Sequence, residues 1–140
     1  MGIVHLVIMS PEVGCGPAER VKEDLLAARE VGEIAFDSVV LGRRVSSIVR
    51  DGVFAGPINT GNATRDRILF VGLADEQALS AYYEAPAHSR VRRAFLSAVS
   101  PEISALYVRA SMEPTNASEI YGEIELRATR FMTRLDVLVP

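Results

Sequence analysis

The first half of the chain alternates between short apolar runs and a segment with helical periodicity. Residues 2–9, GIVHLVIM, are apolar at almost every position, which is typical of a strand covered on both faces. Apolar residues recur at helical spacing over 17–31, and Pro17 and Gly32 favour a helix that begins and ends there. A second strand is predicted within 33–45, EIAFDSVVLGRRV.

The middle of the chain begins with a long connection, 46–65, that contains several glycines. A loop of this length in a compact domain is often functional. A third strand, RDRILFVGL, is predicted over 65–73. Asp75 follows it and is expected to cap a helix from Glu76, because its side chain can accept hydrogen bonds from free backbone amides.

Pro86 divides the helical region that follows. Proline has no backbone N–H, so Pro86 either ends the helix or begins another, which is expected to run to about Val99. After Ser100 and Pro101, the stretch ISALYVRAS predicts a fourth strand over 103–111.

The tail of the chain is compatible with both helix and strand. Asn116 followed by Glu119 resembles a capping box, and apolar residues at helical spacing reach Leu135. Alternating apolar residues suit strands instead, and we expect extended structure in the final stretch. We therefore divide the chain into a domain, 1–112, and a C-terminal extension, 113–140, that packs on it and covers a sheet edge or a cavity mouth.

The order of these elements predicts the fold class. Two successive β-α-β units indicate a ferredoxin-like α+β fold, an antiparallel sheet with its helices on one face. Val4, Leu6 and Ile8 point to one side of the first strand, and the intervening residues point to the other. Helices can cover only one side, so a second copy of the chain is expected to cover the other and form a homodimer.

Composition narrows the classes of function. The 140 residues carry 15 Lys and Arg against 18 Asp and Glu, which argues against a nucleic acid partner. Arg90, Arg92 and Arg93 would point several ways around a helix, which favours a solvated surface over an anion site. Cys15, the single cysteine, fits a reducing, cytoplasmic setting, and no apolar run suits a signal peptide or a membrane span.

Few motifs carry recognisable chemistry. Gly14, Cys15 and Gly16 lie between a strand and a helix, but Glu19 replaces the third glycine of a dinucleotide-binding turn, so a plain turn is favoured. Two histidines and one cysteine cannot form a four-ligand metal site alone. We expect neither a cofactor nor a metal.

His88 is the candidate base. If Pro86 begins the helix, His88 lies in the first turn, where the helix dipole disfavours the imidazolium and keeps the ring neutral near pH 7. The hydroxyl of Tyr82 could orient the ring or stabilise a developing enolate oxygen. The alternative is that His88 and His5 are both buried structural residues with local hydrogen bonds.

Three segments, IVHLVIM, FDSVVLGRRV and ILFVGLADEQALSAYYEAPAHSRV, resemble the stress-responsive dimeric α/β barrel family, also called Dabb. The family signature is a histidine in the first strand, a glycine closing the second and a Tyr-x-x-His-Pro-x-His segment. His5, Gly42 and 82–88 stand at these positions, and Ala85 replaces the first histidine of the segment. The resemblance covers 2–111. It implies two ferredoxin-like subunits whose sheets close into a shared barrel.

The polyketide cyclases of this family suggest a function. The resemblance implies a cofactor-free enzyme that closes a hydrophobic poly-β-ketone by aldol chemistry, with His88 as base and Tyr82 as its partner. We expect the following residues to bind the substrate: His5, Val7, Met9, Arg67 and Tyr83. The alternative is a non-catalytic stress-responsive or ligand-binding dimer with the same barrel, and a cofactor-free monooxygenase is a third possibility.

Overall fold

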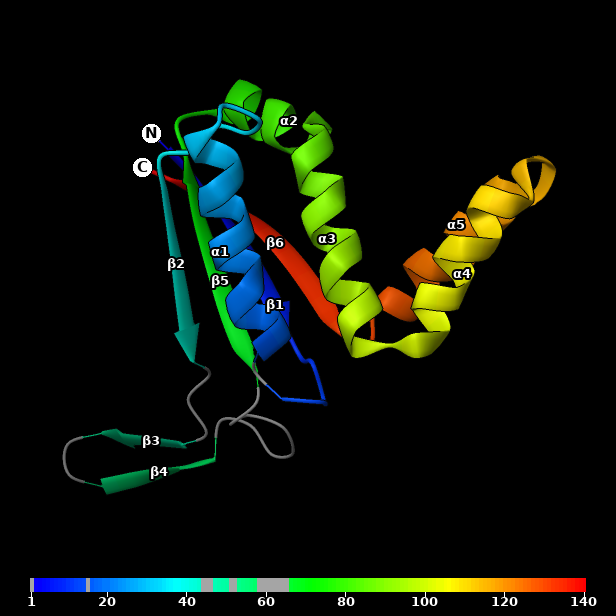
Figure 1. Cartoon of the computed structure of the whole chain (residues 1–140). Helices are drawn as coiled ribbons and strands as arrows, with labels where there is room; N and C mark the ends of the chain where they lie inside the picture. Colours follow the sequence, from blue (N-terminus) through cyan, green and yellow to red (C-terminus); the bar gives the residue numbers. More distant parts are fainter. Residues whose placement is uncertain (1, 15, 44–46, 51–52, 58–65) are drawn as a thin grey trace.

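The structure is a computed structural model that describes residues 2–14, 16–43, 47–50, 53–57 and 66–140. A four-stranded antiparallel sheet with strand order β2-β5-β1-β6 forms its body (Figure 1). The strands of this sheet are β1 (Gly2–Met9), β2 (Ser38–Arg43), β5 (Arg67–Leu73) and β6 (Met132–Val139). Strands β3 (Ser47–Arg50) and β4 (Val53–Pro57) pair as a separate two-stranded sheet.

The helices cover one face of the four-stranded sheet. Helices α1 (Gly16–Glu30) and α3 (Pro86–Val99) lie across it, and the shorter α2 (Glu76–Glu84) precedes α3 (Figure 1). Helices α4 (Pro101–Met112) and α5 (Ala117–Ala128), joined by the 3-10 turn Pro114–Asn116, pack on each other as an arm that projects beside β6. The predicted ferredoxin-like α+β class is confirmed.

The local signals around the second and third helices behave as predicted. The Asp75 side chain accepts a hydrogen bond of 2.8 Å from the backbone N–H of Ala78, which fixes the start of α2. Pro86 is the first residue of α3, and Ala85 between the two helices has extended backbone angles. The proline therefore both ends one helix and begins the next, as its missing N–H requires.

The predicted fourth strand is wrong. Residues 103–111 belong to α4, because the Ser100 hydroxyl accepts a hydrogen bond of 3.1 Å from the backbone N–H of Ile103 and Pro101 occupies the first turn. Ile103, Tyr107 and Ala110 are the buried residues of this helix, and they follow helical spacing. The stretch looked like a strand because it is rich in apolar and small residues, which are compatible with both helix and strand.

The last strand of the sheet comes instead from the tail. Residues 117–128 form α5, and 132–139 form β6, so each of the two patterns in the tail describes a different part of it. β6 is antiparallel to β1 along its whole length, with Leu6 opposite Leu135. It thereby pairs the edge of β1 that would otherwise be open. The division at residue 112 stays a prediction.

Two other expectations fall partly or wholly outside the described residues. The connection 46–65 contains β3 and β4, and its remaining residues are not described. Cys15 also lies outside the described residues.

Gly32, at the end of α1, has a φ of 79°, which favours glycine and agrees with its predicted role as a helix stop.

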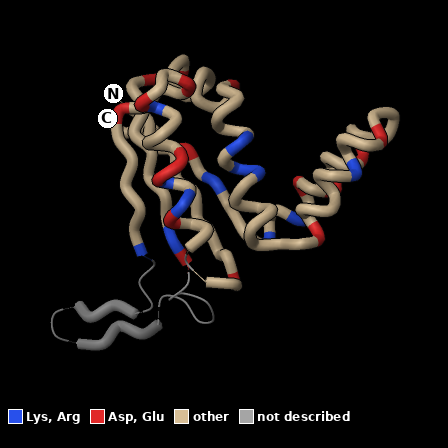
Figure 2. The backbone as a smooth tube through the Cα atoms, viewed as in Figure 1, with Lys and Arg blue, Asp and Glu red and all other residues tan. Residues whose placement is uncertain are grey.

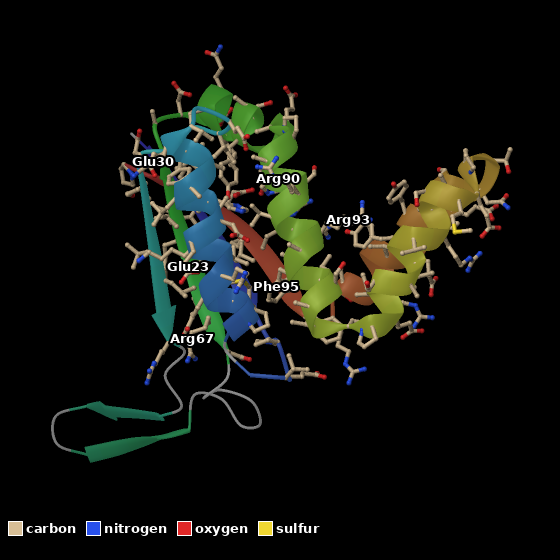
Figure 3. All side chains as sticks on the ribbon, viewed as in Figure 1. Glu23, Glu30, Arg67, Arg90, Arg93 and Phe95 are labelled. Carbon is tan, nitrogen blue, oxygen red and sulfur yellow. The ribbon has the colours of Figure 1, made fainter. Side chains whose placement is uncertain are left out.

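The core lies between the sheet and the two long helices. The side chains of β1 alternate, so that Ile3, His5, Val7 and Met9 are buried under the helices. Phe95, which is 2% exposed, lies between α1 and α3 (Figure 3). The same alternation sends Val4, Leu6 and Ile8 to the other side of the sheet.

That other side, called the open face below, has no helix over it (Figure 1). The strand registers place apolar residues from all four strands on it, and Val40 and Leu135 are 56% and 63% exposed. Its apolar residues are Val4, Leu6, Ile8, Val40, Ile68, Phe70, Leu135, Val137 and Val139. An apolar surface of this extent on a sheet indicates an interaction surface.

Candidate active site

Four separate elements bring polar and aromatic side chains together at one end of the core. His5 comes from β1, Tyr82 and Tyr83 from α2, His88 from the first turn of α3, and Asp136 from β6. His5 faces the helices because of the strand alternation, and Asp136 lies directly opposite it on the neighbouring strand. The break at Pro86 turns the chain so that α2 and α3 both contribute.

Asp136 holds the His5 ring through a short hydrogen bond. His5 Nδ1 lies 2.7 Å from Asp136 Oδ1, and the Tyr83 hydroxyl donates to Asp136 Oδ2 over 2.9 Å. The Tyr83 oxygen is also 3.0 Å from His5 Nδ1. Since Asp136 accepts from both neighbours, the proton of His5 is placed on Nδ1, and the lone pair of its Nε2 remains available.

Burial governs the protonation of His5. The side chain is 2% exposed, and this burial lowers the pKa of His5 below its usual value of 6.5, although the hydrogen bond and charge of Asp136 act to raise it. A neutral histidine with a carboxylate on Nδ1 is the arrangement found in catalytic bases that pair with aspartate. Nε2 of His5 has no hydrogen-bond partner within the described part of the chain.

His88 has a different environment. Its ring packs against Tyr82, with centroids 5.0 Å apart, and against Tyr83, at 5.2 Å. Burial, followed by the charges of His5, Arg92 and Arg134, lowers the pKa of His88 to about 4. The ring is therefore neutral near pH 7, as the sequence predicted, but it is a weaker base than a histidine with a pKa near neutrality.

The two tyrosines are both protonated at neutral pH. Burial raises the pKa of Tyr82 above its usual value of 10, and burial together with Asp136 raises the pKa of Tyr83 to about 12. Each phenol is thus a hydrogen-bond donor. Tyr83 uses its donor on Asp136, whereas no hydrogen bond joins Tyr82 to His88 among the described residues.

A cavity of about 40 Å³ lies next to these rings and is called the inner cavity below. Of the predicted site residues, His5, Val7, Met9, Tyr82 and His88 line it. The rest of its wall is made of apolar residues and two arginines, namely Val21, Leu25, Leu69, Val91, Arg92, Phe95, Met132 and Arg134. It has room for a few water molecules, and a longer molecule would enter from outside.

Two predicted substrate-binding residues lie elsewhere. Tyr83 contacts His5 and Asp136 but does not line the inner cavity. Arg67 lies at the first residue of β5, at the end of the strand next to the grey trace in Figure 3, and does not line the inner cavity either. It is 6% exposed, and its Nη1 donates to the carbonyl oxygen of Asp66.

A second hollow, called the outer hollow below, adjoins the inner cavity. It has a volume of about 380 Å³. It lies between α3, the end of α5 and β6, and its lining residues are Arg92, Glu125, Ala128, Thr129, Met132, Thr133 and Arg134. The inner cavity and the outer hollow share Arg92, Met132 and Arg134, so these three residues separate the histidines from the outer hollow.

Sequence reasoning missed Asp136 and Arg134. Both lie in the tail, for which the sequence predicted no site. A signal was present in the segment RLDVLV. Its two charged residues, Arg134 and Asp136, are two positions apart, which places both side chains on the same face of a strand. Recognising them as site residues required knowing that β6 pairs with β1.

The arginine cluster on α3 is involved in contacts. Arg90 pairs with Glu33, and Arg92 makes a two-pronged ion pair with Glu125 at 2.8 and 3.0 Å. The Arg93 guanidinium lies 4.8 Å from the centre of the Tyr107 ring, on the side of α3 toward the arm (Figure 3). The three side chains do point in different directions, as the spacing predicted.

Within the residues described, no cluster of three or more His, Cys, Asp and Glu side chains suits a metal ion. No helix in the described ranges is long and apolar enough to cross a membrane.

The comparisons with known proteins define a fold class. The sequence matches no protein-family model and no curated protein. A solved structure of a dimeric ferredoxin-like protein of unknown function from Jannaschia sp. CCS1 is similar, with a TM-score of 0.51 and 17% sequence identity. The match covers 99% of this chain and 100% of the other. The two chains share the ferredoxin-like fold.

Acidification is expected to destabilise the folded chain, because His5 and His88 have pKa values below 6.5. As the pH falls, the unfolded chain takes up these protons first, so stability is complete above about pH 6.5 and is lost toward pH 4. The partly exposed His88 should contribute on the order of 1–2 kcal/mol. Urea denaturation between pH 7.5 and pH 4.5 should show a shallower decline for His88→Gln than for the native chain. Parallel profiles for the two proteins would contradict this.

Proposed function

We propose that this protein is a cofactor-independent enzyme of the polyketide-cyclase type, which carries out aldol-type cyclisation of a hydrophobic ketone by acid-base chemistry. The observation that carries the proposal is the buried His5 ring, whose Nδ1 is held 2.7 Å from Asp136 while its ring lines the inner cavity. An oriented, neutral imidazole with a free Nε2 is suited to removing a proton. The resemblance to the Dabb family supports the same chemistry.

The reaction can be assigned to named groups. Nε2 of His5 takes a proton from the carbon next to a ketone, and the resulting enolate carbon attacks a second carbonyl of the same molecule. The imidazolium then returns its proton to the new alkoxide oxygen, so the site ends as it began. Tyr82, a protonated phenol on the wall of the inner cavity, can donate a hydrogen bond to the enolate oxygen.

This assignment gives the base to His5 rather than to His88. His88 has no carboxylate within hydrogen-bonding distance among the described residues, and its pKa of about 4 makes it the weaker proton acceptor at pH 7. Its neutral ring would serve as a wall of the inner cavity and as a hydrogen-bonding group. The catalytic role predicted for His88 is therefore testable against that of His5.

The proposed enzyme is a homodimer joined through the open face. Nine apolar residues from four strands lie on that face, and no described element of the chain covers them. A second sheet of the same kind would bury them and form the shared barrel that the family resemblance implies. The similar solved structure is itself described as dimeric.

A non-catalytic dimer is the second candidate, and the size of the inner cavity favours it. A volume of about 40 Å³ accommodates water rather than a polyketide chain. In this case His5, Tyr83 and Asp136 would be a satisfied polar network that fixes β6 against β1 and α2. In the enzyme, by contrast, the body of the substrate would occupy the outer hollow, with only its reacting carbons in the inner cavity.

Exchange of ketone protons with solvent separates the two candidates. We expect the native protein to accelerate deuterium incorporation next to the carbonyl of 4-phenylbutan-2-one in D₂O, because this requires only the proton-removal step. Mass spectrometry of the ketone would measure the rate, and His5→Gln would serve as the matched inactive variant. If the native protein and the variant give the same rate as buffer, the non-catalytic dimer is the correct candidate.

A further inference from the structure

The inner cavity and the outer hollow have two arginines in common. Arg92 and Arg134 belong to both linings, together with Met132. A molecule that reaches His5 from the outer hollow therefore passes Arg92 on α3 and Arg134 on β6. Figure 2 shows basic positions along α3 and on the strand behind it.

Arg134 packs on a tyrosine that contacts both histidines. Its guanidinium carbon lies 5.1 Å from the centre of the Tyr83 ring. The same ring is 5.1 Å from the His5 ring and 5.2 Å from the His88 ring. Because Arg134, His5 and His88 line the same inner cavity, a group bound there by Arg134 would lie near both histidines.

The donors of Arg134 are available for a ligand. No carboxylate of the described residues forms an ion pair with Arg134, and Asp136, two positions along the same strand face, is engaged by His5 and Tyr83. Arg92 is less available, because Glu125 at the rim of the outer hollow occupies two of its N–H groups. The Arg92 side chain is 21% exposed and that of Glu125 is 61% exposed, so this pair can open toward solvent.

We propose that the substrate carries a carboxylate and that Arg134 binds it, with Arg92 as a second contact once Glu125 is displaced. The inference rests on the proposed function, since it names the substrate class of the same site as an oxo acid. The planar guanidinium of arginine matches a carboxylate through two parallel hydrogen bonds. The same positive charge would stabilise an enolate that forms beside it.

A binding experiment tests this without requiring turnover. The chain has two histidines, so their ring C–H signals in a proton NMR spectrum report on the site directly. The probes are 4-oxo-4-phenylbutanoate and its neutral amide, titrated separately at pH 7.5. We expect both histidine signals to shift with the acid, and the acid to bind about tenfold to a hundredfold more tightly than the amide.

Three variants assign the effect to individual residues. Arg134→Gln should remove the preference for the acid over the amide, because it removes the charge but keeps an exposed polar side chain. Glu125→Gln should strengthen binding of the acid several-fold by releasing Arg92. Arg109→Gln, which alters an arginine paired with Glu113 on the arm, is the matched control and should bind like the native chain.

The outcomes also separate this inference from the proposed function. Equal binding of acid and amide, binding of neither, or a preference that survives Arg134→Gln would overturn the carboxylate site. Selective binding of the acid without any proton exchange would keep the site and reject the enzyme. Proton exchange of a neutral ketone, with no preference for binding acids, would keep the enzyme and reject the carboxylate site.

Discussion

Replacing Asp136 with asparagine is expected to lower the rate of ketone proton exchange by about a hundredfold to ten-thousandfold. The carboxylate accepts the Nδ1 proton of His5 over 2.7 Å and thereby keeps Nε2 as the acceptor. An asparagine can present its amide N–H to Nδ1, which would favour the other tautomer and place a proton on Nε2. His5→Gln, which removes the base itself, should be at least as damaging.

Comparison with neighbouring variants isolates the role of the carboxylate. Tyr83→Phe removes the hydrogen bond of 2.9 Å to Asp136 but leaves the hydrogen bond between Asp136 and His5, so it should reduce the rate much less. His88→Gln should also have a smaller effect than His5→Gln. Thermal denaturation of each variant would show whether it remains folded. A folded Asp136→Asn protein with the native rate would refute the assignment of His5 as base.

Leu6→Lys is expected to convert the proposed homodimer into a monomer. Leu6 lies at the middle of β1 on the open face, opposite Phe70 on β5 and Leu135 on β6. In a dimer closed through this face, the lysine would be buried without a partner, which costs several kcal/mol per subunit and is doubled by symmetry. Multi-angle light scattering should show half the native mass at micromolar concentration.

A matched substitution tests whether position matters. Leu126→Lys makes the same chemical change at a residue of α5 that is 68% exposed and lies outside the open face, and it should leave the dimer intact. Circular dichroism would confirm that Leu6→Lys remains folded. A native protein that is monomeric, or a folded Leu6→Lys protein that stays dimeric, would show that the open face is not the interface.

The first strand and the region around Pro86 could be predicted from local patterns. A short apolar stretch rich in β-branched residues, such as 2–9, favours a buried strand, and the alternation of a strand puts His5 and Leu6 on opposite sides of the sheet. Asp75 and Pro86 act through their own backbone neighbours, so the ends of α2 and the start of α3 follow from residue type. The placement of His88 in the first turn of α3 follows in the same way.

The fourth strand could not be identified in this way. The stretch 103–111 is compatible with both periodicities, and the hydrogen bond from Ile103 to the Ser100 hydroxyl, together with Pro101 in the first turn, makes it a helix. The tail 132–139 is apolar at alternating positions, which favours a strand, but this pattern does not say which strand of the sheet it pairs with. Its assignment depends on backbone pairing with β1, and that pairing joins residues more than a hundred positions apart.

The sequence by itself determined that the first strand is apolar on both sides, that His5 lies on it and that His88 lies in the first turn of α3, because each of these depends on interactions within a few residues. The tertiary structure alone decided which carboxylate meets His5. Asp136 reaches it across 131 positions of sequence, and only the pairing of β6 with β1 brings the two side chains within 2.7 Å. Local periodicity gives the face on which a side chain lies, but the register between distant strands chooses its neighbour.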